Sequence, residues 1–185
     1  MTSKIRARAE NLATFRSVSV QLMEILSRWV PTTPEMEAKV LFGRHIWDFA
    51  QHADMLGKRT FELRAPLHFT LAPVDSYAAL LAEVSSAKTA AGRMSSLYDG
   101  LLPGLSARYK TYLDVTDSLL DEPSVRIVQR IVTDLARMTE ESRELRAALP
   151  HLNIADKSLS AGLATREMLV ANIVSHQPAV RAGGA

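Results

Sequence analysis

The spacing of the apolar residues constrains this fold more than any other feature of the sequence. Apolar side chains recur every three or four positions along most of the chain, as in the run Leu12, Phe15, Leu22, Leu26 and Trp29. The strict alternation typical of half-buried β-strands is nearly absent. Prolines and glycines stand mostly where these helical patterns stop. The pattern therefore predicts an all-α protein.

Prolines and capping residues set the expected limits of the helices. Thr33-Pro34 predicts a helix start with a cap and a proline in the first turn, and Asp121-Glu122-Pro123 predicts another. The expected helices span residues 8–30, 34–64, 75–87, 89–119 with a kink at Pro103-Gly104, 121–149 and 155–175. Long helices with short linkers and one longer connection predict an antiparallel four-helix bundle with a kinked third helix and an extra C-terminal helix. We expect one domain over residues 1–175 and a mobile tail over 176–185.

The composition excludes several classes of protein and of site. The chain of 185 residues contains no cysteine, so disulfides, thiolate metal sites and cysteine nucleophiles are excluded. No signal peptide is visible near the N-terminus, and no apolar run reaches the ~18 residues of a membrane span. Basic and acidic residues are interspersed, with a net charge of +2. We therefore expect a cytoplasmic protein that binds neither nucleic acid nor membrane.

One polar strip carries residues suited to chemistry. On the helix expected over 34–64, Glu37, His45, Asp48 and His52 fall within about a quarter turn of one another. Asp48 and His52 are four residues apart, and His45 and Asp48 are three apart, so these side chains share one face. Imidazole and carboxylate groups are the ligands that iron, manganese or zinc accept.

The orientation of this strip is open at the level of the sequence. An apolar face lies roughly opposite, which is the pattern of an amphipathic helix whose polar side meets solvent. Trp47 and Val40 form a second apolar flank, which instead favours a central helix with its polar strip turned inward. The face opposite the strip consists of Phe42, Ile46, Phe49 and Ala53.

A weak internal repeat suggests a second half for the site. When Asp48 is superposed on Asp134, the segment 44–52 resembles the segment 129–138, and Met138 takes the place of His52. Asp134 falls at the edge of an apolar helix face, where a carboxylate is costly unless it has a partner. The alternative is that two amphipathic helices resemble each other by chance.

Residues 8–149 resemble the ferritin-like superfamily, because they form two expected helix pairs with acidic residues and histidine turned inward. That resemblance implies a four-helix bundle with a long crossover and a dinuclear iron or manganese site, built from Glu on two helices and Glu-x-x-His on the other two. The sequence departs from this pattern in three places. No Glu stands mid-bundle in the first or third helix, since Glu24 falls off the apolar stripe and Glu83 precedes the long run. Asp48 and His52 are one residue further apart than Glu-x-x-His, and Met138 stands where a second histidine is needed.

The resemblance implies a non-haem iron or manganese oxidase or oxygenase acting on a small molecule. Its metal ligands would be Glu37, Asp48, His52 and Asp134, with His45 as the catalytic base or a further ligand. A second hypothesis is a metal-free bundle that serves as a binding or assembly module. A third is a metal-free enzyme that pairs His45 or His52 with Asp48 as a general base. The substrate, the redox partner and a homo-oligomeric state are left open.

Overall fold

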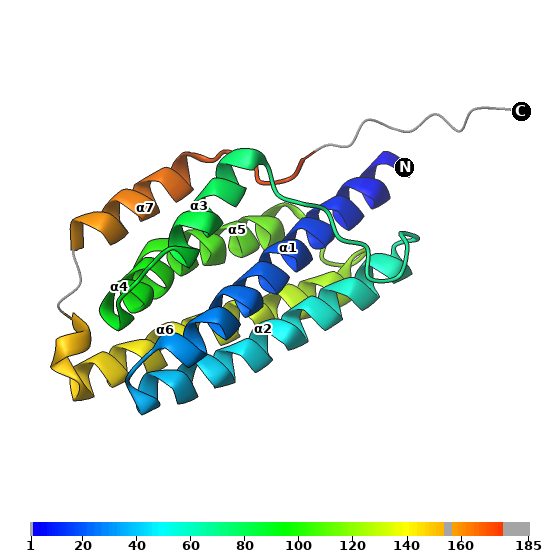
Figure 1. Ribbon diagram of the computed structural model, residues 1–185. Helices are drawn as coiled ribbons and strands as arrows, with labels where there is room; N and C mark the ends of the chain where they lie inside the picture. The colour runs from blue at the N-terminus through cyan, green and yellow to red at the C-terminus, as the bar shows by residue number, and fades with distance from the viewer. Residues whose placement is uncertain (1, 154–156, 176–185) are drawn as a thin grey trace, which may run out of the picture.

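The computed structural model describes residues 2–153 and 157–175, and it is built from helices (Figure 1). Its α-helices are α1 (Thr2–Trp29), α2 (Met36–Glu62), α3 (Asp75–Ser85), α4 (Ala90–Met94), α5 (Leu102–Val115), α6 (Glu122–Ala148) and α7 (Lys157–Leu169). Short 3-10 turns span Val30–Thr32 and Pro150–Asn153, and a π-helical stretch spans Ser95–Leu101. Within the described residues the β-pairing is limited to one isolated bridge between Pro73 and Val174. The predicted all-α class is confirmed.

Several helix limits differ from the sequence-based expectation: α1 begins at Thr2 instead of residue 8, and α5 ends at Val115 instead of residue 119. Two further differences have identifiable reasons. Helix α2 begins at Met36, with Glu35 at the N-cap position. Thr33 does not cap this helix, because its hydroxyl donates to the Trp29 carbonyl, 2.8 Å away. Helix α7 ends at Leu169, short of residue 175. The chain beyond it bridges Pro73 through Val174, which requires an extended backbone. The expected tail 176–185 lies outside the described residues.

The long helices lie side by side and alternate in direction. Helix α1 packs against α2, α2 against α6, and α6 against α5, each neighbour running opposite to the one before (Figure 1). Helices α3 and α7 lie together over the π-helical stretch and α5. Within the described residues no helix combines the length and the apolar character needed to cross a membrane.

The core draws on all of these helices. Of the apolar face of α2 opposite the polar strip, Phe49 is 1% exposed, whereas Ile46 is only partly buried against the core. The tyrosines Tyr98, Tyr109 and Tyr112 are also buried, so they belong to the interior. Burial of this apolar surface is the main source of stability for such a fold.

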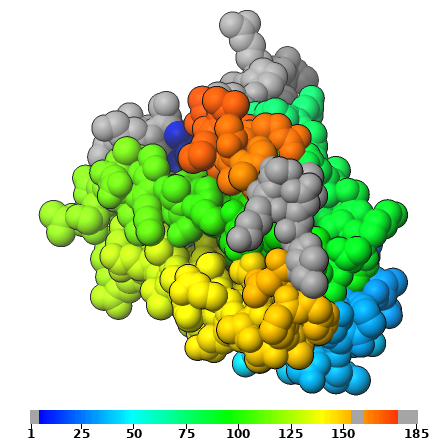
Figure 2. Space-filling view, turned by 90° about the vertical axis from the view of Figure 1, so that its left-hand side faces the viewer, coloured from blue at the N-terminus to red at the C-terminus, as the bar shows by residue number. Residues whose placement is uncertain are grey.

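The irregularity expected at Pro103-Gly104 lies one turn earlier. The π-helical stretch Ser95–Leu101 ends with a hydrogen bond from the Leu102 amide to the Leu97 carbonyl, five residues back. Regular α-helix resumes at Leu102, with Pro103 in its first turn, where a missing N–H costs least. Figure 2 shows α7 lying on this segment. The proline thus starts a new helix after a π-helical turn.

Candidate functional site

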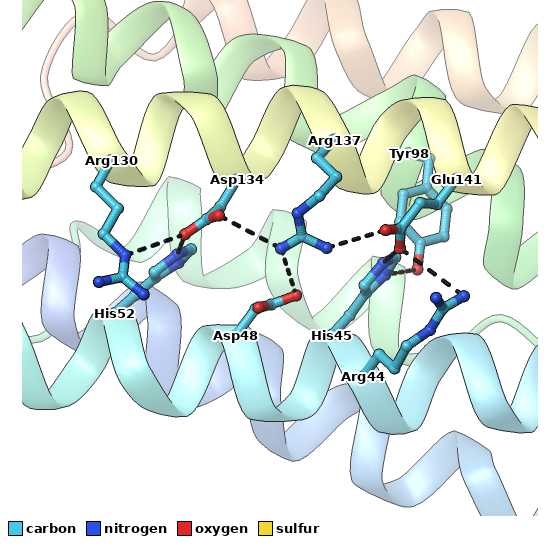
Figure 3. A network of polar contacts seen from close by, with 9 residues as sticks. All are labelled: Arg44, His45, Asp48, His52, Tyr98, Arg130, Asp134, Arg137 and Glu141. Carbon is cyan, nitrogen blue, oxygen red and sulfur yellow. Dashed lines mark hydrogen bonds and ion pairs between the residues drawn. The ribbon is translucent and has the colours of Figure 1, made fainter.

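Three residues of the predicted polar strip of α2, His45, Asp48 and His52, face α6 and belong to one connected set of side chains (Figure 3). The histidines are fully enclosed, with His45 0% and His52 1% exposed. The interpretation of the strip as a solvated face is therefore wrong for them. The second apolar flank meets solvent instead, since Trp47 is 66% and Val40 55% exposed. We refer to this set as the α2–α6 polar network: His45, Asp48 and His52 on α2, Asp134, Arg137 and Glu141 on α6, and Tyr98.

One half of the network centres on His45. Its Nε2 lies 3.0 Å from the Glu141 carboxylate, and its Nδ1 lies 2.6 Å from the Tyr98 hydroxyl. Burial lowers the pKa of His45, and its hydrogen bond with Glu141 offsets this only in part, so the imidazole is neutral. Burial raises the pKa of Tyr98, so the phenol keeps its proton. The tautomer follows: Tyr98 donates to Nδ1, and Nε2–H donates to Glu141.

The other half centres on His52. Its Nε2 lies 3.0 Å from the Asp134 carboxylate, which fulfils the expectation that Asp134 needs a partner. Burial lowers the pKa of His52, and the hydrogen bond with Asp134 opposes this shift. Partial burial raises the pKa of Asp134, but the hydrogen bonds from His52 and Arg137 outweigh it, and the net shift is downward. Nε2–H therefore donates to an ionised Asp134, while the buried Nδ1 has no hydrogen-bond partner among the described residues.

Arg137 joins the two halves. Its guanidinium donates to the carboxylate of Asp48 at 2.9 Å and to that of Glu141 at 3.1 Å, and it lies 3.4 Å from Asp134. Its hydrogen bond with Asp48 raises its pKa further, so this cation is permanent. Three carboxylates from two helices thus converge on one positive charge.

This arrangement does not fit an iron or manganese ion. The carboxylates of Asp48, Asp134 and Glu141 already neutralise Arg137, and a metal ion would have to displace that guanidinium. Among the described residues no group of three or more histidine or acidic side chains is placed to hold a metal ion. Glu37 stands apart from the network, exposed in a surface groove that Arg44 and Glu141 also line. The metal roles of Glu37, Asp48, His52 and Asp134 remain predictions.

Sequence reasoning missed three members of the network. Arg137 and Glu141 follow Asp134 by three and seven residues, so the helical period alone places them on the same stripe of α6. This signal was present in the sequence. Tyr98 had no such signal, because the π-helical stretch that carries it breaks the regular helical period.

A separate pocket opens at the end of the molecule where α1 begins and α2 ends. It has a volume of about 550 Å³ and is lined mostly by apolar side chains. Ala9 and Leu71 form a buried part of its wall, and Phe69 is half-buried. The remaining lining residues are Ile5, Arg6 and Glu10 on α1 and Leu63, Arg64, Ala65 and Pro66 after α2. This volume falls in the range of small-molecule sites.

Comparison with known proteins adds no relative. No protein-family model matches the chain, and neither a curated protein nor a solved structure matches it. The resemblance to the ferritin-like superfamily therefore rests on the residues quoted for it.

Proposed function

We propose that this chain is a metal-free four-helix bundle that binds a small apolar molecule. The bundle consists of α1, α2, α6 and the long helical segment that ends in α5, which pack as antiparallel neighbours. This choice favours the binding-module hypothesis over the iron or manganese oxidase. The observation that carries it is the apolar pocket between the start of α1 and the loop that follows α2.

The α2–α6 polar network supports the metal-free part of the proposal. Arg137 occupies the point on which Asp48, Asp134 and Glu141 converge. Arg44, 4.0 Å from Glu141, and Arg130, 3.8 Å from Asp134, supply the two further positive charges that balance the three carboxylates. The histidines each give a proton to a carboxylate. The bonds His45–Glu141, His52–Asp134 and Asp48–Arg137 each join α2 to α6, so the network holds the two helices in one register. In this proposal the α2–α6 polar network has a structural role.

The pocket supports the binding part of the proposal. Its apolar lining comes from two segments far apart in sequence, which helix packing brings together. Concave, mostly apolar pockets with a few polar groups at the mouth are the usual form of small-molecule sites. Arg6, Glu10 and Arg64 supply those polar groups here.

A neutral fluorescent probe, N-phenyl-1-naphthylamine, tests the pocket directly. We expect its fluorescence to rise on binding to the folded protein. Ala65→Trp places a large ring in the pocket and should weaken binding about tenfold or more. Ala161→Trp, on an exposed site of α7, is the matched control and should leave binding unchanged. Equal binding by both variants would place the probe elsewhere and refute the proposal.

Elemental analysis after anaerobic reconstitution with Fe(II) or Mn(II) tests the metal-free part. We expect wild type and His52→Ala to retain the same small amount of metal, well below one ion per chain. A stoichiometric ion in the wild type that His52→Ala loses would instead support the metalloprotein hypothesis. The variant's folded state is checked by circular dichroism, since His52 is buried.

A further inference from the structure

Arg64 adopts a backbone conformation that glycine usually provides. Its φ is 65°, in the left-handed region. The Arg64 amide donates to the Phe61 carbonyl at 2.9 Å, and the Ala65 amide donates to the Thr60 carbonyl at 3.0 Å. These two bonds form a Schellman motif that ends α2, with Arg64 at the position where glycine is preferred. A side chain there is strained, because its Cβ crowds the backbone.

No polar interaction of the Arg64 side chain with the described residues offsets this strain. Within the described part of the chain its guanidinium makes no hydrogen bond or ion pair, and it lies exposed at the pocket. Non-glycine residues in this region of φ and ψ concentrate at ligand-binding sites, where function maintains the strain. Arg64 therefore needs a reason other than stability.

The pocket beside Arg64 supplies that reason. The other arginine in its lining, Arg6, donates from Nε to the Glu10 carboxylate at 2.8 Å. Arg64 is the cationic group of the lining that has no acidic partner among residues 2–153 and 157–175. An apolar wall next to such a guanidinium matches a molecule with an apolar body and an acidic head. A guanidinium binds a carboxylate through two parallel hydrogen bonds, which fixes orientation as well as charge.

We propose that the pocket takes a small amphipathic carboxylate, whose apolar part contacts Phe69 and Leu71 and whose head group is bound by Arg64. This inference rests on the proposed function, since it names the ligand class of the same pocket. It predicts that a single residue governs both ligand charge preference and the stability of the α2 end.

Displacement of N-phenyl-1-naphthylamine by octanoate and by 1-octanol measures the charge preference in the full chain. We expect octanoate to compete about tenfold better than octanol in the wild type. Arg64→Gly should abolish that preference, because octanoate competition weakens much more than octanol competition, and it should raise Tm by about 2 °C, because glycine relieves the strained backbone. Arg64→Lys should retain part of the preference, since it keeps the charge without the planar fork.

His68→Gly is the matched control. His68 also has a positive φ, 55°, and is exposed, but it does not line the pocket. This variant should raise Tm while the octanoate preference stays at the wild-type value. If Arg64→Gly keeps the preference, or if octanoate competes no better than octanol, the carboxylate assignment is wrong while the apolar pocket stands. If the probe does not bind at all, the proposed function fails as well. Binding to anionic lipid vesicles without octanoate competition would also overturn the assignment.

Discussion

The two histidines of α2 are neutral bases that burial removes from solvent. His45 and His52 each donate Nε2–H to a carboxylate of α6, but burial of the ring disfavours the imidazolium more than the carboxylate favours it. Each histidine pKa is thus lowered from its ordinary value of 6.5 in the folded state. The unfolded chain binds these protons more readily than the folded chain.

The histidines therefore predict a loss of stability in mild acid. As pH falls below about 6.5, the unfolded state takes up protons that the folded state does not, so the free energy of unfolding decreases. Between pH 7.5 and 5.5 each histidine contributes a loss of up to about 1.4 kcal/mol. Urea unfolding at several pH values measures this slope. The His45→Gln/His52→Gln double variant should show a clearly flatter profile, and an unchanged slope would contradict the assignment.

At the scale of elements, glycines determine how closely α7 approaches the rest of the molecule. A Cβ built on Gly100 would lie 2.7 Å from Cδ2 of Leu163, and one on Gly104 would collide with the Glu167 carboxylate. Glu167 is buried and binds Arg108, with 2.6 Å between Arg108 Nε and a carboxylate oxygen, so it is held in place. No glycine among the described residues has a positive φ, so space rather than backbone conformation requires glycine here.

Alanine substitutions at helical glycines should accordingly change stability in opposite directions. Gly104→Ala forces Glu167 away and should cost about 1–3 kcal/mol, the range for overpacking. Gly43→Ala is the control, because a Cβ there meets nothing within 4 Å and alanine is the better helix former. It should stabilise the protein by about 0.5–1 kcal/mol. Hydrogen exchange locates the effect, and faster exchange in α7 for Gly104→Ala alone is the expected result.

At the scale of the whole molecule, Asp121 ties distant parts of the chain together. It is 0% exposed and accepts hydrogen bonds from Arg59 of α2 at 2.9 Å, Tyr112 of α5 at 2.8 Å and Ser124 of α6 at 2.6 Å. These bonds lower its pKa, although burial by itself raises it. The carboxylate therefore joins three helices at the corner where α5 leads into α6.

Removal of this carboxylate should weaken the entire fold. Asp121→Ala removes the buried carboxylate of Arg59, which keeps only the more exposed Glu62 as a partner, and it takes the acceptor away from Tyr112 and Ser124. It should cost about 3 kcal/mol in the free energy of unfolding. Asp121→Asn should cost less, because the amide oxygen still accepts hydrogen bonds. Asp54→Ala is the control: it removes an exposed pair with Lys58, worth about 0.5 kcal/mol or less. Equal losses for Asp121→Ala and Asp54→Ala would show that this corner is not a stabilising centre.

Local sequence signals predicted most of the elements and part of the candidate site. The helix class and nearly all helix positions follow from apolar spacing, prolines and capping residues, which act within a few residues along the chain. His45, Asp48 and His52 were placed on one face for the same reason. Asp134 came from the internal repeat, and the structure pairs it with His52. The contacts between α2 and α6 could not be predicted in this way, because they depend on how the two helices pack.

The sequence by itself determined which residues share a helix face, because the helical period is a local property of the backbone. Only the tertiary structure decided which face is buried and which partner each polar side chain meets. The strip of α2 turned inward while Trp47 stayed exposed, since α6 presents matching carboxylates and Arg137. Glu141 lies 96 positions from His45, and helix periodicity carries no information over that distance. The pocket at Arg64 likewise exists because the start of α1 lies beside the loop after α2.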